Sequence, residues 1–449
     1  MEQYDDAVTY CKNCIDLAKE LGNKEDEMSA CLCLGKAYLE MEQYDDAVTY
    51  CKNCIDLAKE LGNKEDEMSA YLCLGKAYLE MEQYDDAVTY CKNCIDLAKE
   101  LGNKEGEMSA YLCLGKAYLE MEQYDDAVTY CKNCIDLAKE LGNKEDEMSA
   151  CLCLGKAYLE MEQYDDAVTY CKNCIDLAKE LGNKEDEMSA CLCLGKAYLE
   201  MEQYDDAVTY CKNCIDLAKE LGNKEGEMSA YLYLVKAYLE MEQYDDAVTY
   251  CKNCIDLAKE LGNKEGEMSA YLCLGKAYLE MEQYDDAVTY CVSGNGKEYD
   301  DAVTYCKNCI DLAKELGNKE DEMSAYLCLG KAYLEMEQYD DAVTYCKNCI
   351  DLAKELGNKE DEMSAYLCLG KAYLEMEQYD DAVTYCKNCI DLAKELGNKE
   401  GEMSAYLCLG KAYLEMEQYD DAVTYCKNCI DLAKELGNKK KAKCQRISI

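Results

Sequence analysis

The chain has 449 residues, with 94 acidic and 48 basic side chains and a formal net charge of -46. It contains 36 Cys and 42 Tyr but no His, Pro, Trp or Phe, so no imidazole is available as a general base, a metal ligand or a partner for a catalytic Ser or Cys. The acidic surface argues against DNA or RNA as a partner, because such binding depends on Lys and Arg.

The composition also bears on the compartment. The N-terminus, Met1–Asp6, has neither the basic start nor the apolar stretch of a signal peptide, and no window approaches the roughly 18 apolar residues of a membrane span. Disulfide scaffolds are short chains without a core, whereas this chain is long and rich in Leu and Ala. We therefore expect free thiols, a cytoplasmic location and no contact with a membrane.

The organisation of the chain is set by a repeat. A unit of forty residues begins at Met41 and recurs almost letter for letter at Met81 and Met121, and so on to Met241. After Met281 the pattern breaks, and Tyr299 then takes the place of Tyr284, fifteen residues later. The copies are nearly identical, so their sameness says nothing about the importance of any position.

In chain order, residues 1–22 form an unpaired second helix of a truncated repeat, and residues 23–291 form a continuous array. Its units contain a first helix, represented by Met68–Glu80, and a second helix, represented by Tyr84–Leu101, each with apolar residues at spacings of three and four. Gly102 suits the left-handed residue that closes a helix, and Asn103 can cap the next one. A hairpin of this size cannot bury its own apolar face, so the hairpins must stack into an all-α solenoid.

The array is then interrupted. Residues 292–298 form a Gly-containing break, residues 299–438 continue the array after the phase shift, and residues 439–449 form a basic tail that we expect to be disordered. Either the short copy before the break is extruded and the solenoid continues, or one stack ends there and another begins. Both ends of the chain look cut, so we expect a fragment whose uncapped ends can self-associate.

One copy carries an unusual substitution. Val235 stands where the other copies have the Gly that lets two helices approach closely. Overpacking of this kind costs about 1–3 kcal/mol, and we expect a local displacement of the helix pair.

These residues resemble the tetratricopeptide repeat. Its signature, an aromatic residue, two residues, Leu-Gly, two more residues and Tyr, is matched by Tyr71, Leu74-Gly75 and Tyr78. The chain has Lys99 where the family has a helix-ending Pro, which lets the second helix run about one turn further. The longer unit is similar to that of spindle-orientation and G-protein-signalling scaffolds and of kinesin light chains. The resemblance implies antiparallel helix hairpins wound into a right-handed superhelix.

The resemblance also implies a binding surface, because first helices line the concave wall in this family. Ser69, Leu72, Lys76 and Leu79 form a stripe on the first helix, beside Cys73 and Glu80. Stacking turns this stripe into a peptide-binding ladder of Leu72, Leu79, Glu80 and one Lys per unit, namely Lys36, Lys76, Lys116, Lys156, Lys196, Lys236, Lys276, Lys331, Lys371 and Lys411. The alternative is that each Lys merely solubilises an exposed face and pairs with the Glu four residues on.

The cysteines offer a rival interpretation. Eleven C-x-x-C pairs, of which Cys91 and Cys94 form one, have the spacing of a metal or redox site. A structural zinc site needs four ligands, however, and a free Cys inside a helix acts as a small apolar residue. We therefore favour core packing and expect no metal, no cofactor and no catalytic residue.

Taken together, these features predict a cytoplasmic, non-enzymatic scaffold that binds peptide or helical segments of other proteins in a concave groove. Basic or amphipathic segments suit its acidic surface. The alternative function is that of a thiol-rich metal-binding or redox protein.

Overall fold

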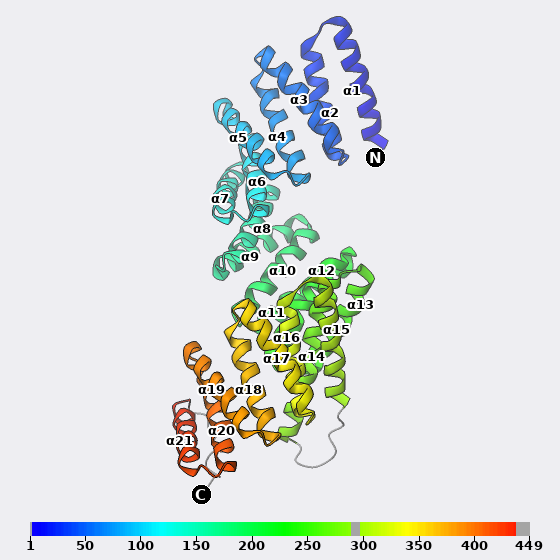
Figure 1. Cartoon of the computed structure of the whole chain (residues 1–449). Helices are drawn as coiled ribbons and strands as arrows, with labels where there is room; N and C mark the ends of the chain where they lie inside the picture. The colour runs from blue at the N-terminus through cyan, green and yellow to red at the C-terminus, as the bar shows by residue number, and fades with distance from the viewer. Residues whose placement is uncertain (1, 289–296, 437–449) are drawn as a thin grey trace. The chain divides into compact units, whose positions relative to one another are not determined.

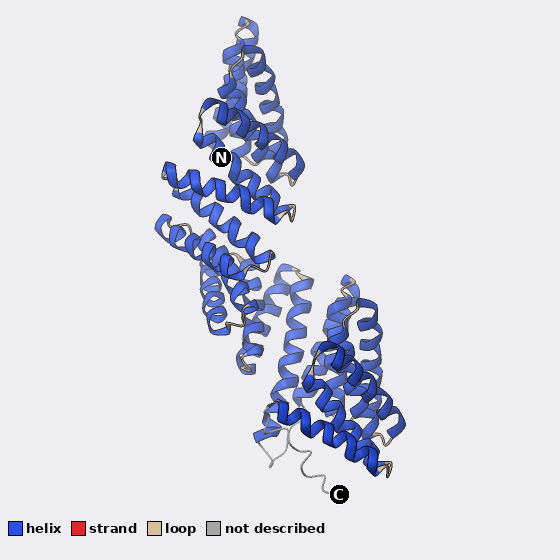
Figure 2. Ribbon diagram, turned by 90° about the vertical axis from the view of Figure 1, so that its left-hand side faces the viewer, coloured by secondary structure: helices blue, strands red, loops and turns tan. Residues whose placement is uncertain are grey.

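The fold consists of helices alone. The computed structural model describes residues 2–288 and 297–436, and those residues form 21 helices and contain no strand. They fall into two compact units, Met1–Ala230 and Tyr231–Ile449, each of which is a stack of helix hairpins (Figures 1 and 2). The expected all-α solenoid is confirmed.

The helices of the first unit are α1 (Glu2–Leu21), α2 (Lys24–Glu40), α3 (Tyr44–Leu61), α4 (Lys64–Glu80), α5 (Tyr84–Leu101), α6 (Lys104–Glu120), α7 (Tyr124–Leu141), α8 (Lys144–Glu160), α9 (Tyr164–Leu181), α10 (Lys184–Glu200) and α11 (Tyr204–Leu221). The boundary between the units falls within α12 (Lys224–Glu240). The helices of the second unit are α13 (Tyr244–Leu261), α14 (Lys264–Val288), α15 (Lys297–Leu316), α16 (Lys319–Glu335), α17 (Tyr339–Leu356), α18 (Lys359–Glu375), α19 (Tyr379–Leu396), α20 (Lys399–Glu415) and α21 (Tyr419–Glu435). Even numbers mark first helices and odd numbers mark second helices.

The helix ends follow from local sequence. Gly102 closes α5 in the left-handed conformation with a φ of 69°, and the Asn103 side chain accepts a hydrogen bond of 2.8 Å from the Gly106 N–H at the start of α6. Both predictions are confirmed. The predicted second helix, Tyr84–Leu101, matches α5, whereas α4 begins four residues before the predicted Met68 because its first turn is polar and capped rather than packed.

The turn between α4 and α5 is closed by an unusual residue. Glu82 has a φ of 58°, and the Gln83 N–H donates to the Tyr78 carbonyl at 2.9 Å. This hydrogen bond closes the C-terminus of a helix in the way that normally requires Gly. A Glu occupies the left-handed position in nine such turns of the described chain.

In the core of most hairpins, small side chains on one helix face a Gly on the other. Cys91 and Cys94 of α5 are fully buried, and so is Leu74 of α4. Gly75 faces Cys91 without a side chain between them, which brings α4 and α5 close together. Beside this contact the rings of Tyr78 and Tyr90 stack with centroids 5.4 Å apart.

The phase shift is absorbed without ending the stack. Helix α14 forms the first helix of its repeat and continues into the start of the short copy. Helix α15 packs against α14 in the way that a second helix does. Gly275 faces Cys306, and Tyr278 stacks on Tyr305 at 5.8 Å, as the equivalent residues do elsewhere. Helices α14, α15 and α16 therefore contact one another as successive helices of one stack. Residues 292–296 of the break and the tail at 439–449 lie outside the described residues.

Helix α1 packs against α2, as the unpaired second helix of the sequence would. Its other face is uncovered, since Tyr10 is 74% exposed and Leu17 is 57% exposed.

Candidate binding groove

Within each unit the first helices approach one another. In the first unit α2 contacts α4, α4 contacts α6, α6 contacts α8 and α8 contacts α10, and in the second unit α14, α16, α18 and α20 contact one another in succession. No two second helices make contacts of that extent in the described ranges. The spacing is therefore tighter on the first-helix side, and each stack curves so that its first helices line the inner face.

Pockets open on this inner face. One of about 480 Å³ in the first unit is lined by Leu79 and Glu80 of α4, by Lys116 of α6 and by residues of α2 and α8. A second pocket, of about 420 Å³, repeats this arrangement one hairpin further along. Each pocket combines an apolar Leu floor, Lys ammonium groups and several carboxylates. The same elements recur because the hairpins recur.

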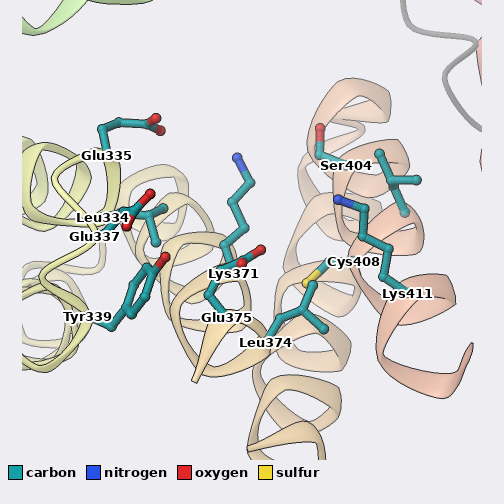
Figure 3. A pocket seen from close by; sticks show the side chains of 11 residues that line it. Leu334, Glu335, Glu337, Tyr339, Lys371, Leu374, Glu375, Ser404, Cys408 and Lys411 are labelled. Carbon is teal, nitrogen blue, oxygen red and sulfur yellow. The ribbon is translucent and has the colours of Figure 1, made fainter. Parts of the chain in front are cut away.

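The second unit contains a pocket of the same construction, with a volume of about 310 Å³. Figure 3 shows Lys371 of α18 and Lys411 of α20 extending from neighbouring helices, with Leu374 below them and Glu335 on the far side. Tyr339, from the start of α17, closes one side.

The predicted ladder occupies this surface. Five of its lysines line the three pockets, namely Lys76, Lys116, Lys156, Lys371 and Lys411. The others hold the same position of their own first helices, where most are exposed, namely Lys36, Lys196, Lys236, Lys276 and Lys331. Leu79 and Glu80 line two of the pockets. Leu72 is half-buried and outside them, but its counterparts Leu112 and Leu152 are pocket residues.

One ladder lysine shows how charges pair along the groove. Lys196 of α10 lies 2.8 Å from Glu160 of α8, the preceding first helix. The pairing expected for a merely solvated face was with the Glu four residues on, which here is Glu200. The observed pair instead links two successive hairpins along the groove.

Carboxylates outnumber ammonium groups in the pocket of about 480 Å³. Two lysines, Lys76 and Lys116, face five acidic residues, which are Glu40, Glu42, Glu80, Glu145 and Asp146. Burial raises the pKa of Asp146, and the charges of Lys76 and Lys116 oppose that rise. The potential of the pocket therefore favours a cationic group.

Two sets of groove residues were missed by the sequence analysis. One is the turn glutamate with the following tyrosine, such as Glu82 and Tyr84, and the other is the acid near the start of a first helix, such as Asp146. Sequence reasoning placed that acid only at a helix start. Its alternation with Gly between otherwise matching copies was the signal that could have found it.

Most of the C-x-x-C cysteines are buried in the hairpin cores, away from the groove, whereas Cys14 is exposed and Cys11 and Cys426 are partly buried. Burial raises the pKa of Cys94 to about 12, so its thiol is protonated at neutral pH. No group of three Cys, Asp or Glu side chains in the described part of the chain is arranged to hold a metal ion. These features fit the packing interpretation of the cysteines.

Comparisons with known families point in one direction. Models described as tetratricopeptide repeat match residues 27–100, 66–140, 106–180, 226–290, 321–395 and 361–435, and a further such model matches 190–225. A search of curated proteins by sequence finds no match. No helix among the described residues is long and apolar enough to cross a membrane.

Solved structures share the fold. The apo form of RapI has a TM-score of 0.59 at 12% identity, with 83% of this chain and 99% of that one covered. A signal transduction ATPase with a tetratricopeptide repeat sensor, from Pyrococcus horikoshii, has a TM-score of 0.57 at 15% identity, with 85% of this chain and 55% of that one covered. The apo form of the quorum sensor NprR from B. thuringiensis has a TM-score of 0.52 at 17% identity, with 82% of this chain and 99% of that one covered. At such identities the likeness concerns the fold alone.

Proposed function

Because this chain belongs to the tetratricopeptide repeat family, we propose that it is a non-enzymatic scaffold that binds segments of partner proteins along the first-helix groove. The observation that carries the proposal is the repeated pocket, in which leucines, two lysines and several carboxylates recur one hairpin apart in the first unit and again in the second unit. An extended or helical segment can place its side chains in successive pockets and its backbone carbonyls on the ladder lysines.

The chemistry of the groove favours basic or amphipathic segments. The net charge of -46 accelerates their association, and binding weakens as salt screens the charges. No cofactor enters this function. A reducing cytoplasm suits the many buried free thiols.

The test uses a random peptide library selected against the full chain. The selected peptides are then measured against Leu79→Ala/Lys116→Ala, which removes groups shared by two pockets, and against the control Lys139→Ala. The Lys139 side chain, on the second helix α7, is 63% exposed, and its Nζ lies 3.8 Å from the Glu147 Oε1. Its removal therefore changes the charge without touching the groove.

We expect the groove variant to weaken binding at least tenfold, which corresponds to about 1.4 kcal/mol, while the control changes it less than twofold. Equal affinity of the selected peptides for both variants would place the binding surface elsewhere and overturn the proposal.

A further inference from the structure

One position varies between hairpins that are otherwise nearly identical. The third residue of the first helix is Asp26, Asp66, Gly106, Asp146, Asp186 and Gly226 in the first unit, and the second unit has Gly266, Asp321, Asp361 and Gly401 at that position. In the first unit two Asp are followed by one Gly, and the series then repeats. Within each unit the variation therefore fits a period of three hairpins, and between the units Gly226 is followed directly by Gly266.

This position belongs to the groove. Asp146 lines the pocket that contains Lys76 and Lys116, and Asp186 lines the pocket that contains Lys116 and Lys156. The carboxylate is held in place, because Asn143 donates from Nδ2 to the Asp146 Oδ2 at 3.0 Å. If the Asp served only to stabilise the start of its helix, it would not need to lie in a pocket with lysines from the two preceding hairpins, as Asp146 does with Lys76 and Lys116.

The electrostatics support the same placement. The two pocket lysines oppose the burial-driven rise in the pKa of Asp146, and Lys276 and Lys236 do so for Asp321. Asp146 and Asp186 thus each add one carboxylate to a pocket in which the other carboxylates already outnumber the two lysines. Lys196, one hairpin before Gly226, pairs with Glu160 of the preceding first helix.

We infer that this Asp is a specificity-determining residue, which favours a partner segment with Lys or Arg side chains opposite the Asp-lined pockets over the positions where Gly leaves one carboxylate fewer. The inference rests on the proposed function and names the partner's chemistry. A lysine or arginine side chain reaches the Asp carboxylate while its aliphatic stem covers the Leu floor. Two hairpins that carry the Asp, followed by one that lacks it, set the register of the bound segment.

The probes are a synthetic peptide of alternating lysine, leucine and serine residues and a matched peptide with glutamine in place of each lysine. The loss variant is Asp146→Asn/Asp186→Asn, and the gain variant is Gly226→Asp. The control, Asp136→Asn/Asp176→Asn, removes the same charge from exposed positions of the second helices. All of these chains should fold, because the position already holds either Asp or Gly, and a Cβ at Gly226 would meet its nearest neighbours at 3.2 Å.

At low salt the loss variant should bind the lysine peptide about tenfold more weakly than the control variant does, and the gain variant should bind it about threefold more tightly than the wild-type chain. The glutamine peptide should not distinguish the variants. Equal weakening in the loss and control variants would overturn the inference, because only net charge would then matter. Absence of lysine-peptide binding to the wild-type chain, with library peptides still bound in the groove, would overturn the inference and leave the proposed function intact.

Discussion

Gly75 of α4 lies so close to Cys91 of α5 that a Cβ added to Gly75 would come within 2.3 Å of the Cys91 Sγ. The same relationship recurs in the second unit, where Gly370 faces Cys386 at 2.4 Å. Protein interiors are close-packed, so a larger residue on either side forces the helices apart. The close hairpin therefore depends on a Gly and a small thiol together.

Val235 breaks this pairing in one copy, where it is fully buried. Changing Val235→Gly should raise the free energy of unfolding by about 1–3 kcal/mol, less about 0.5 kcal/mol for the lower helix propensity of Gly. Urea denaturation followed by circular dichroism measures the change. The reciprocal Gly75→Val should destabilise the chain, and a chain that is indifferent to both substitutions would contradict this account of the hairpin core.

The turn residues make a matched pair of predictions. Gly102 has a φ of 69° with nothing within 4 Å of an added Cβ, so Gly102→Ala should destabilise the chain by about 1 kcal/mol through the backbone alone. Glu82 has a φ of 58°, a left-handed conformation that is costly for a residue with a Cβ. Glu82→Gly should therefore stabilise the chain by up to about 1 kcal/mol. Thermal unfolding of the two variants tests this. Destabilisation by Glu82→Gly would contradict the prediction, because it would show that the Glu82 side chain stabilises the folded chain.

The buried thiols predict a loss of stability at alkaline pH. Burial raises the pKa of Cys54, Cys94 and Cys134 from 9.0 to about 12. A raised pKa means that the folded chain holds these protons more tightly, so the stabilisation is fully present below pH 9 and is lost as the pH rises from 9 toward 12.

Replacing these three thiols with Ala should therefore flatten the fall of the unfolding midpoint between pH 8 and about 10.5. Differential scanning calorimetry at the two pH values measures the slope in both chains. Identical slopes would mean that the thiols do not titrate with unfolding. Addition of a chelator to the wild-type chain should leave its midpoint unchanged, whereas a fall would favour the metal-binding alternative.

The repeated outer ion pairs should contribute little. Lys64 of α4 pairs with Glu100 of α5, and both side chains are about half exposed. Exposed pairs of this kind are worth about 0–1 kcal/mol, so Lys64→Ala should change the free energy of unfolding by less than 1 kcal/mol. A loss of several kcal/mol in urea denaturation would show that the pair is much stronger than its exposure implies.

Much of the fold could be predicted because the same local signals recur in each copy. The spacing of Leu74, Gly75 and Tyr78 identified the first helix, and Gly102 with Asn103 marked the boundary between hairpins. The start of α4 was placed late because its first turn, from Lys64, is fixed by an N-cap rather than by apolar periodicity.

The groove was predicted only in part. The ladder follows from one helical face, so Lys76 and Leu79 could be identified from the first helix alone. Asp146 and Tyr84 reach the groove from other elements, which only the stacking of hairpins brings together. The outcome of the phase shift was also beyond sequence reasoning, because it depends on whether α15 can pack against α14 as a second helix does.

The most direct test of the groove is a crystal structure of the full chain with a selected peptide bound. The account predicts that the peptide lies across successive first helices, with side chains against Leu79 and Leu119 and charged groups near Lys116. A peptide bound instead to the second helices, over Tyr90 and Tyr130, would contradict it.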